Sequence, residues 1–152
     1  RLRSNFLRVF ESVREAAEFL STTEGKILIT TGSKELKEYT KIGNYQERCF
    51  ARVLSTKAAM EESVRLGFEG KHLIAMQGPF SEEMNLALLH QTRARYFVTK
   101  ESGKAGGFEE KLKAAKKAGA VLIVIGRPQE RGRSVQEVCH FIESNFGKKE
   151  QE

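Results

Sequence analysis

Five short apolar runs, each followed by a segment with helical patterning, constrain the fold of this 152-residue chain more than any other feature. The runs cover residues 26–31, 48–54, 72–76, 94–99 and 120–125. Apolar runs of this length predict strands, whereas apolar residues spaced three or four apart predict helices. Strands that alternate with helices form βαβ units with right-handed crossovers. The sequence therefore predicts an α/β fold, a three-layer α/β/α sandwich around a mostly parallel five-stranded sheet.

The helical segments begin and end at residues that are typical of helix termini. A capping box opens at Ser12, Ser81 is a predicted N-cap, and Gly119 follows the last residue of another helix. The first, third and fifth apolar runs are nearly continuous, which is typical of strands covered on both faces, whereas the second alternates and is expected nearer an edge. The predicted helices cover 12–20, 56–66, 81–93, 108–118 and a segment that begins with a second capping box at Ser134.

A chain of 152 residues is long enough for one domain with a buried core. The predicted organisation is a linker and leading helix over residues 1–25, an α/β domain over 26–147, and a polar tail over 148–152. No apolar run is long enough to span a bilayer. Cys49 and Cys139 lie far apart in the sequence, which favours a reducing cytoplasm over a disulfide framework, and the three histidines show no metal-ligand spacing.

The chain carries 26 Lys and Arg against 20 Asp and Glu, a net charge of +6. This excess indicates either ordinary surface solubility or attraction to nucleic acid, to anionic lipid, or to a phosphorylated or polycarboxylate small molecule. The charges are dispersed, and no recognition-helix or RNA-binding motif accompanies them. We therefore expect no nucleic-acid or membrane partner.

Polar and glycine residues gather directly after the predicted strands. Parallel α/β sheets bind ligands beyond the carboxyl ends of their strands, where backbone amides and cations form anion sites. Each of these loops is also compatible with a simple turn or helix cap. The segments concerned are Thr30–Ser33, Gln77–Ser81 with Asn85, Thr99–Gly107, and Gly126–Pro128.

Known catalytic motifs do not account for these loops. The sequence has no G-x-S-x-G elbow, no G-x-G-x-x-G fingerprint and no complete phosphate-binding P-loop. No pair of carboxylates stands out as an acid and base. Amides, hydroxyls and cations without such a pair suit a cofactor that carries its own chemistry.

The loop motifs, taken in order and at their spacing, resemble one known family. They are 30–33 (TTGS), 51–54 (ARVL), 77–81 (QGPFS) with Glu83 and Asn85, 98–103 (VTKESG) with Gly106, Gly107, Glu110 and Lys111, and 125–128 (IGRP). Over residues 26–128 the sequence resembles the precorrin-6A reductase family of cobalamin biosynthesis, whose anaerobic-pathway members act on cobalt-precorrin-6A.

The resemblance implies a Rossmann-like fold, NADPH as cofactor, and reduction of one double bond of an anionic tetrapyrrole. Family members are usually longer, with an N-terminal Rossmann-like half that opens on a Gly-Gly-Thr motif. Residues 26–147 would then be the C-terminal domain of a two-domain reductase, with the N-terminal half of the same polypeptide as partner. The competing hypothesis is a non-catalytic α/β module that binds an anionic ligand or partner.

The resemblance also makes twelve residues candidates for binding cofactor or substrate. Hydroxyls and amides after the first run would bind a phosphate or carboxylate, the two cations would pair with anionic groups, and the Gly-Pro-Phe segment would form an apolar wall. Lys100, or a water molecule, is the candidate proton donor. The residues are Thr31, Gly32, Ser33, Gln77, Gly78, Pro79, Phe80, Asn85, Lys100, Ser102, Gly103 and Arg127.

Overall fold

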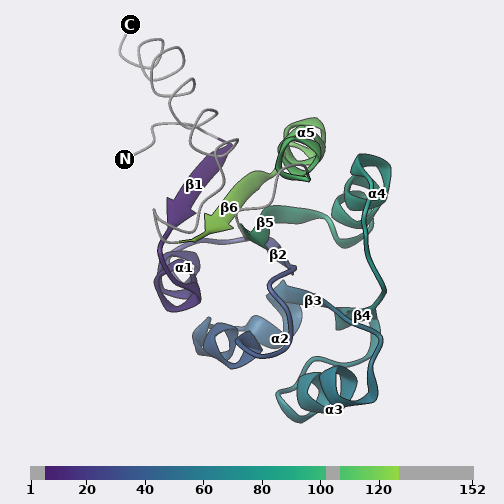
Figure 1. Ribbon diagram of the computed structural model, residues 1–152. Coiled ribbons are helices and arrows are strands. Elements are labelled where there is room, and N and C mark those ends of the chain that lie inside the picture. The colour runs from purple at the N-terminus through teal and green to yellow at the C-terminus, as the bar shows by residue number, and fades with distance from the viewer. Residues whose placement is uncertain (1–5, 102–106, 127–152) are drawn as a thin grey trace, which may run out of the picture.

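The strands of this chain form a single parallel sheet in the computed structural model, which describes residues 6–101 and 107–126 (Figure 1). Neighbouring strands pair in parallel throughout, in the order β1-β6-β5-β2-β3-β4. The strands are β1 (Leu7–Phe10), β2 (Lys26–Ile29), β3 (Cys49–Val53), β4 (Leu73–Ala75), β5 (Ala94–Lys100) and β6 (Val121–Ile125).

Helices cover both faces of the sheet, as the runs of apolar residues predict. One face packs against α1 (Val13–Leu20), the 3-10 helix η1 (Leu36–Lys41), α2 (Tyr45–Arg48) and α3 (Lys57–Arg65). The other face packs against α4 (Glu82–Thr92) and α5 (Phe108–Ala118), and a short 3-10 helix, η2 (Gly70–His72), precedes β4. Alternate residues of each strand therefore enter two separate cores, one on each face. The α/β/α sandwich is confirmed.

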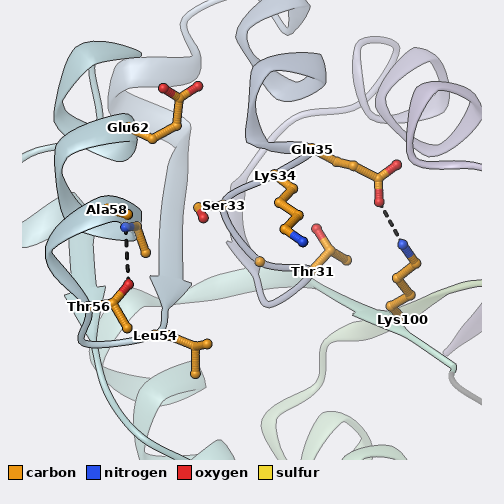
Figure 2. Close-up of a pocket in the computed structure, with 11 residues that line it drawn as sticks. Thr31, Ser33, Lys34, Glu35, Leu54, Thr56, Ala58, Glu62 and Lys100 are labelled. Atoms are coloured by element: carbon orange, nitrogen blue, oxygen red, sulfur yellow. Dashed lines mark hydrogen bonds and ion pairs between the residues drawn. The ribbon is translucent and has the colours of Figure 1, made fainter.

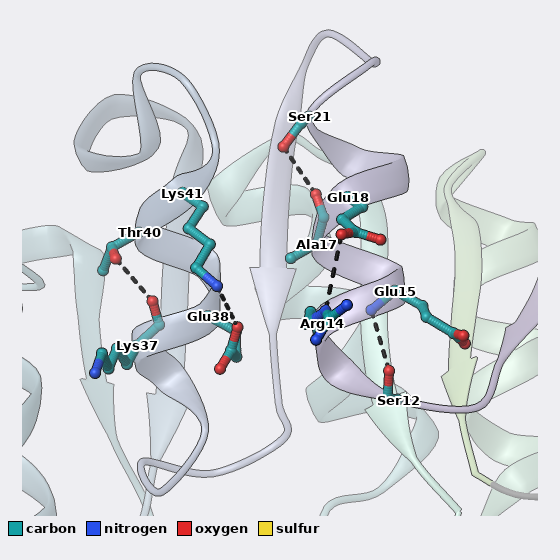
Figure 3. Close-up of polar contacts among 10 residues, drawn as sticks. All are labelled: Ser12, Arg14, Glu15, Ala17, Glu18, Ser21, Lys37, Glu38, Thr40 and Lys41. Atoms are coloured by element: carbon teal, nitrogen blue, oxygen red, sulfur yellow. Dashed lines mark hydrogen bonds and ion pairs between the residues drawn. The ribbon is translucent and has the colours of Figure 1, made fainter.

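Helix caps form where the sequence predicts them. The Ser12 hydroxyl accepts a hydrogen bond from the backbone N–H of Glu15 at 3.1 Å, and at the other end of α1 the Ser21 hydroxyl donates to the Ala17 carbonyl (Figure 3). Ser81 caps α4 through the backbone N–H of Met84. Gly119 ends α5 with a φ of 71°, a conformation that favours glycine. The helix predicted from Ser134 lies outside the described residues.

Within the described residues the sheet has six strands, one more than the five predicted. β1 lies within the segment expected to be a linker, and it pairs along its whole length with β6. Its signal in the sequence is weak because it is only four residues long and includes Arg8. The helical segments η1 and α2, between β2 and β3, were likewise not predicted.

The edge of the sheet also differs from the expectation. β3 is internal, between β2 and β4, and all five of its residues are buried, whereas β4 is the edge strand and its residues are only partly buried. The alternation in the second run comes from Arg52, which reads as a solvent-facing residue but is only 6% exposed. β3 lies next to the edge strand, and its alternation comes from a buried arginine and not from an exposed face.

Successive strands are added in opposite directions across the sheet on either side of the β2–β5 pair, although all strands are parallel. From β2 the chain continues to β3 on the α1–α3 face, and from β5 it continues to β6 on the α4–α5 face. The two strands are neighbours, so the segments that follow them diverge at the carboxyl edge. Such a topological switch point is where open α/β sheets bind their ligands.

Candidate functional site

A cavity of about 800 Å³ opens at the carboxyl edge of β2, β3 and β5, next to the topological switch point. The loop after β2 forms one wall, the first turns of α3 form another, and the end of β5 contributes a lysine (Figure 2). The lining residues are Thr31, Gly32, Ser33, Lys34, Glu35, Leu54, Thr56, Ala58, Ala59, Glu62 and Lys100. Four predicted site residues, Thr31, Gly32, Ser33 and Lys100, are thus brought together.

A hydrogen bond to a buried tyrosine holds the loop after β2 in place. The Thr31 and Tyr39 hydroxyls are 2.8 Å apart and hydrogen-bonded, and the Tyr39 side chain is fully buried. Burial raises the pKa of Tyr39 well above its usual value, so this phenol stays protonated at neutral pH. Gly32 has a φ of 87°, which a side chain would strain, and no atom lies within 4 Å of where its Cβ would be. The turn therefore presents backbone toward open space.

Lys100 is paired with an acidic residue. Its Nζ donates to the Glu35 carboxylate at 2.7 Å, a contact drawn in Figure 2, and the two side chains are 54% and 41% exposed. An exposed ion pair contributes at most about 1 kcal/mol. An anionic ligand can therefore replace Glu35 as the partner of Lys100, and Lys34 lines the same cavity.

The segment after β4 lies apart from the cavity. The side-chain oxygen of Gln77 accepts hydrogen bonds from the backbone N–H and the hydroxyl of Ser55, at 3.3 and 3.2 Å. These bonds tie the end of β4 to the end of β3. The Gly78–Pro79 peptide bond is cis. None of these three predicted site residues lines the cavity.

Phe80 and Asn85 instead surround Arg52 on the opposite face of the sheet. The Arg52 guanidinium lies 3.6 Å from the centroid of the Phe80 ring, and its Nη1 donates to the Asn85 Oδ1 at 2.7 Å. The predicted apolar wall is thus a cover over a buried cation. The other predicted site residues, Ser102, Gly103 and Arg127, lie outside the described residues.

Sequence reasoning missed several residues of the site. Glu35 and Thr56 line the cavity without belonging to any recognised motif, and Leu54, the last residue of the 51–54 motif, was not among the predicted site residues. Arg52 did carry a signal, because a charged residue within an otherwise apolar strand needs a partner if it is buried. The expectations of a reducing environment for the cysteines and of no metal-ligand spacing among the histidines stay predictions. Burial raises the pKa of Cys49 to about 12, which leaves almost no thiolate at neutral pH.

The described residues contain neither a metal-ligand cluster nor a membrane-spanning helix. Within 6–101 and 107–126, no three His, Cys, Asp or Glu side chains are grouped so that they could hold a metal ion. The helices in that part of the chain also lack the length and hydropathy needed to cross a membrane.

Replacing Tyr39 with phenylalanine is expected to lower the free energy of unfolding by about 0.5–1.5 kcal/mol, because the Thr31 hydroxyl loses its partner. A double-mutant cycle with Thr31→Val, followed by chemical denaturation, isolates this bond. We expect the two effects to be non-additive, with the double variant costing less than the sum. Additive effects would show that the bond does not hold the loop.

Comparison with known proteins gives one family. The family described as Precorrin-6x reductase CbiJ/CobK matches residues 3–143. The cobalt-precorrin-6A reductase of Priestia megaterium is 40% identical over 142 residues, which cover 90% of this chain and 56% of that protein. The cobalt-precorrin-6A reductase of Salmonella typhimurium is 38% identical over 117 residues, which cover 77% of this chain and 44% of that protein.

A solved structure supports the fold. The chain of a CobK precorrin-6A reductase superposes with a TM-score of 0.61 at 18% identity, over 84% of this chain and 50% of that one. The chain thus spans about half the length of the relatives it matches. The match over residues 3–143 includes all four predicted residues that line the cavity. The chain therefore belongs to the precorrin-6x reductase CbiJ/CobK family.

Proposed function

We propose that this chain is the C-terminal α/β domain of an NADPH-dependent reductase that acts on precorrin-6A or cobalt-precorrin-6A in cobalamin biosynthesis. The observation that carries the proposal is the cavity at the topological switch point, in a chain that belongs to this family. The relatives named cobalt-precorrin-6A reductase support the choice of substrate class.

The residues around the cavity suit a ligand that is anionic at one end and apolar at the other. Ser33 and the backbone of Gly32 offer donors, and the ammonium groups of Lys34 and Lys100 supply positive charge. Leu54, although 55% exposed, lies on the rim with Ala58 and Ala59, and these form the apolar part. Both a dinucleotide and a tetrapyrrole with carboxylate arms have this mixed character.

The nicotinamide cofactor, when bound, supplies the hydride. The chain itself then has to bind and orient cofactor and substrate and to protonate the substrate. We assign the binding of an anionic group to Ser33, Lys34 and Lys100. Lys100 also holds a proton on its Nζ, hydrogen-bonded to Glu35, at the mouth of the cavity. It is therefore our candidate proton donor, with a water molecule as the alternative.

The rest of the relatives' length is expected to supply the second wall of the active site. The cavity is open, and the chain spans about half of the proteins it matches. We propose that a second Rossmann-like half, N-terminal in the same polypeptide, closes over this edge, and that the domain alone does not turn over substrate. We propose that the reaction takes place in the reducing cytoplasm, which the two widely separated cysteines favour.

The test is an assay of the full-length polypeptide with NADPH, with and without the tetrapyrrole. We expect the absorbance of reduced nicotinamide to fall only when the tetrapyrrole is present, with one equivalent consumed for each macrocycle reduced. The isolated domain serves as the control and should show no turnover. Tight binding of the tetrapyrrole without any consumption of NADPH would instead support a non-catalytic binding module.

A further inference from the structure

Arg52 is a buried cation on the face of the sheet opposite the cavity wall formed by α3. It lies on β3, its side chain faces the layer of α4 and α5, and the residue is 6% exposed. Burying an ionised group costs several kcal/mol unless it is paired and hydrogen-bonded. Such a residue therefore requires a partner.

The partners that Arg52 has do not neutralise it. A guanidinium has five N–H donors. Nη1 donates to the Asn85 Oδ1 at 2.7 Å, and Phe80 covers the planar face with its ring. Gly78 permits this cover, because a Cβ there would lie 3.1 Å from the Phe80 ring. Among the described residues no carboxylate forms an ion pair with Arg52, and burial lowers its pKa to about 10.

Asn85 provides an independent sign of an absent ligand. The residue is fully buried in the first turn of α4, and its Nδ2 is buried without a hydrogen-bond acceptor within the described ranges. An unsatisfied buried donor costs about 1–3 kcal/mol. Because Oδ1 is fixed by Arg52, Nδ2 remains available beside the guanidinium for an acceptor from outside the chain.

A second cation, Lys111, interacts electrostatically with Arg52. Lys111, in the first turn of α5, is half-buried, and burial lowers its pKa. Glu101 raises the pKa of Lys111, whereas the nearby Arg52 lowers it. The N-termini of α4 and α5 add the positive ends of two helix dipoles. Lys111 thus adds a second cation near Arg52, at the N-terminal ends of two helices whose first turns also carry Glu82, Glu83, Glu109 and Glu110.

We propose that Arg52, Asn85 and Lys111 form a binding site for an oxyanion, a carboxylate or phosphate group. The anion would accept from the free edge of the guanidinium and from Nδ2 of Asn85, and Lys111 would add charge. Carboxylates and phosphates are the anions that an arginine edge binds with two parallel hydrogen bonds. This site is distinct from the cavity on the other face and does not depend on reductase activity. A side arm of a tetrapyrrole and the phosphate of a nucleotide carry the same chemistry.

The experiment is calorimetric titration of the 152-residue chain with two probes, inorganic phosphate and the polycarboxylate uroporphyrin. Arg52→Met is expected to weaken binding by about tenfold or more, since a hydrogen bond to a charged group is worth about 1.5–3 kcal/mol. The control Arg14→Met removes the same charge from a side chain that is 72% exposed on α1, and it should leave the affinity unchanged. Binding of phosphate alone identifies a phosphate site, and binding of uroporphyrin alone identifies a carboxylate site.

A second variant, Asn85→Asp, tests the proposed oxyanion site even if Arg52→Met fails to fold. The new carboxylate replaces the unsatisfied Nδ2 with an oxygen and pairs with Arg52. We therefore expect Asn85→Asp to raise the Tm of the unliganded chain and to abolish the part of the binding that Arg52→Met weakens. If neither probe binds the unmodified chain, or if Asn85→Asp lowers the Tm while binding is retained, the proposed site is wrong.

Discussion

Full-length reductase carrying Lys100→Met is expected to lose about tenfold to a hundredfold in kcat/KM. Lys100 is the cation that the end of β5 brings into the cavity. A charge-assisted hydrogen bond to a ligand is worth about 1.5–3 kcal/mol, and each 1.4 kcal/mol is about a factor of ten. Methionine keeps the length and apolar stem of the side chain but removes the ammonium group. Steady-state kinetics with the tetrapyrrole as the varied substrate measure the loss.

Two further variants determine whether the charge acts at the site. Lys113→Met removes a charge from an exposed position on α5 and should leave kcat/KM unchanged within twofold. Glu35→Gln removes the carboxylate that competes with a ligand for Lys100, so KM is expected to stay the same or fall. An unchanged kcat/KM in Lys100→Met would remove Lys100 from both of its proposed roles.

Replacing Leu28 with alanine is expected to cost about 2–5 kcal/mol of unfolding free energy. Leu28 is fully buried on β2, between β5 and β3, and it packs into the core beneath α4 and α5. The cavity left by the lost side chain cannot collapse easily because strands pair on both sides. Domains of this kind are stable by only about 5–15 kcal/mol, so the change consumes a large share of that stability.

The matched control is the same substitution at Leu54, which is 55% exposed at the rim of the cavity. We expect Leu54→Ala to change stability by less than about 0.5 kcal/mol. Urea denaturation of both variants provides the comparison. Similar losses of unfolding free energy at the two positions would contradict the burial of Leu28 and the exposure of Leu54.

The parts of the fold that follow local rules were predicted from the sequence. Apolar runs separated by helical spacing indicated the alternating parallel sheet, and capping at Ser12 and Ser81 followed from residue type. The rule that ligands bind at carboxyl ends directed attention to the loop after β2, which lines the cavity in the structure. These features depend on a few neighbouring residues only.

The features that were missed depend on distant partners. β1 is a strand because β6, more than a hundred residues later, pairs with it. Glu35 reaches Lys100 only because β2 and β5 become neighbours in the sheet. The partners of Arg52 were missed because periodicity describes which face a residue occupies and not what covers that face. The pairing of β1, the Glu35–Lys100 contact and the cover over Arg52 all depend on which strands are neighbours. Local residue spacing does not encode that strand order.

The central claim is that the edge of the sheet at the β2 and β5 switch point binds cofactor or substrate. The most direct test is amide-resolved NMR of the 152-residue chain, titrated separately with NADPH and with uroporphyrin. We predict that at least one ligand shifts the amides of Gly32, Ser33 and Lys34 together with those at the start of α3. If both ligands at about millimolar concentration leave these amides unmoved, or shift only residues elsewhere, the cavity is not the site.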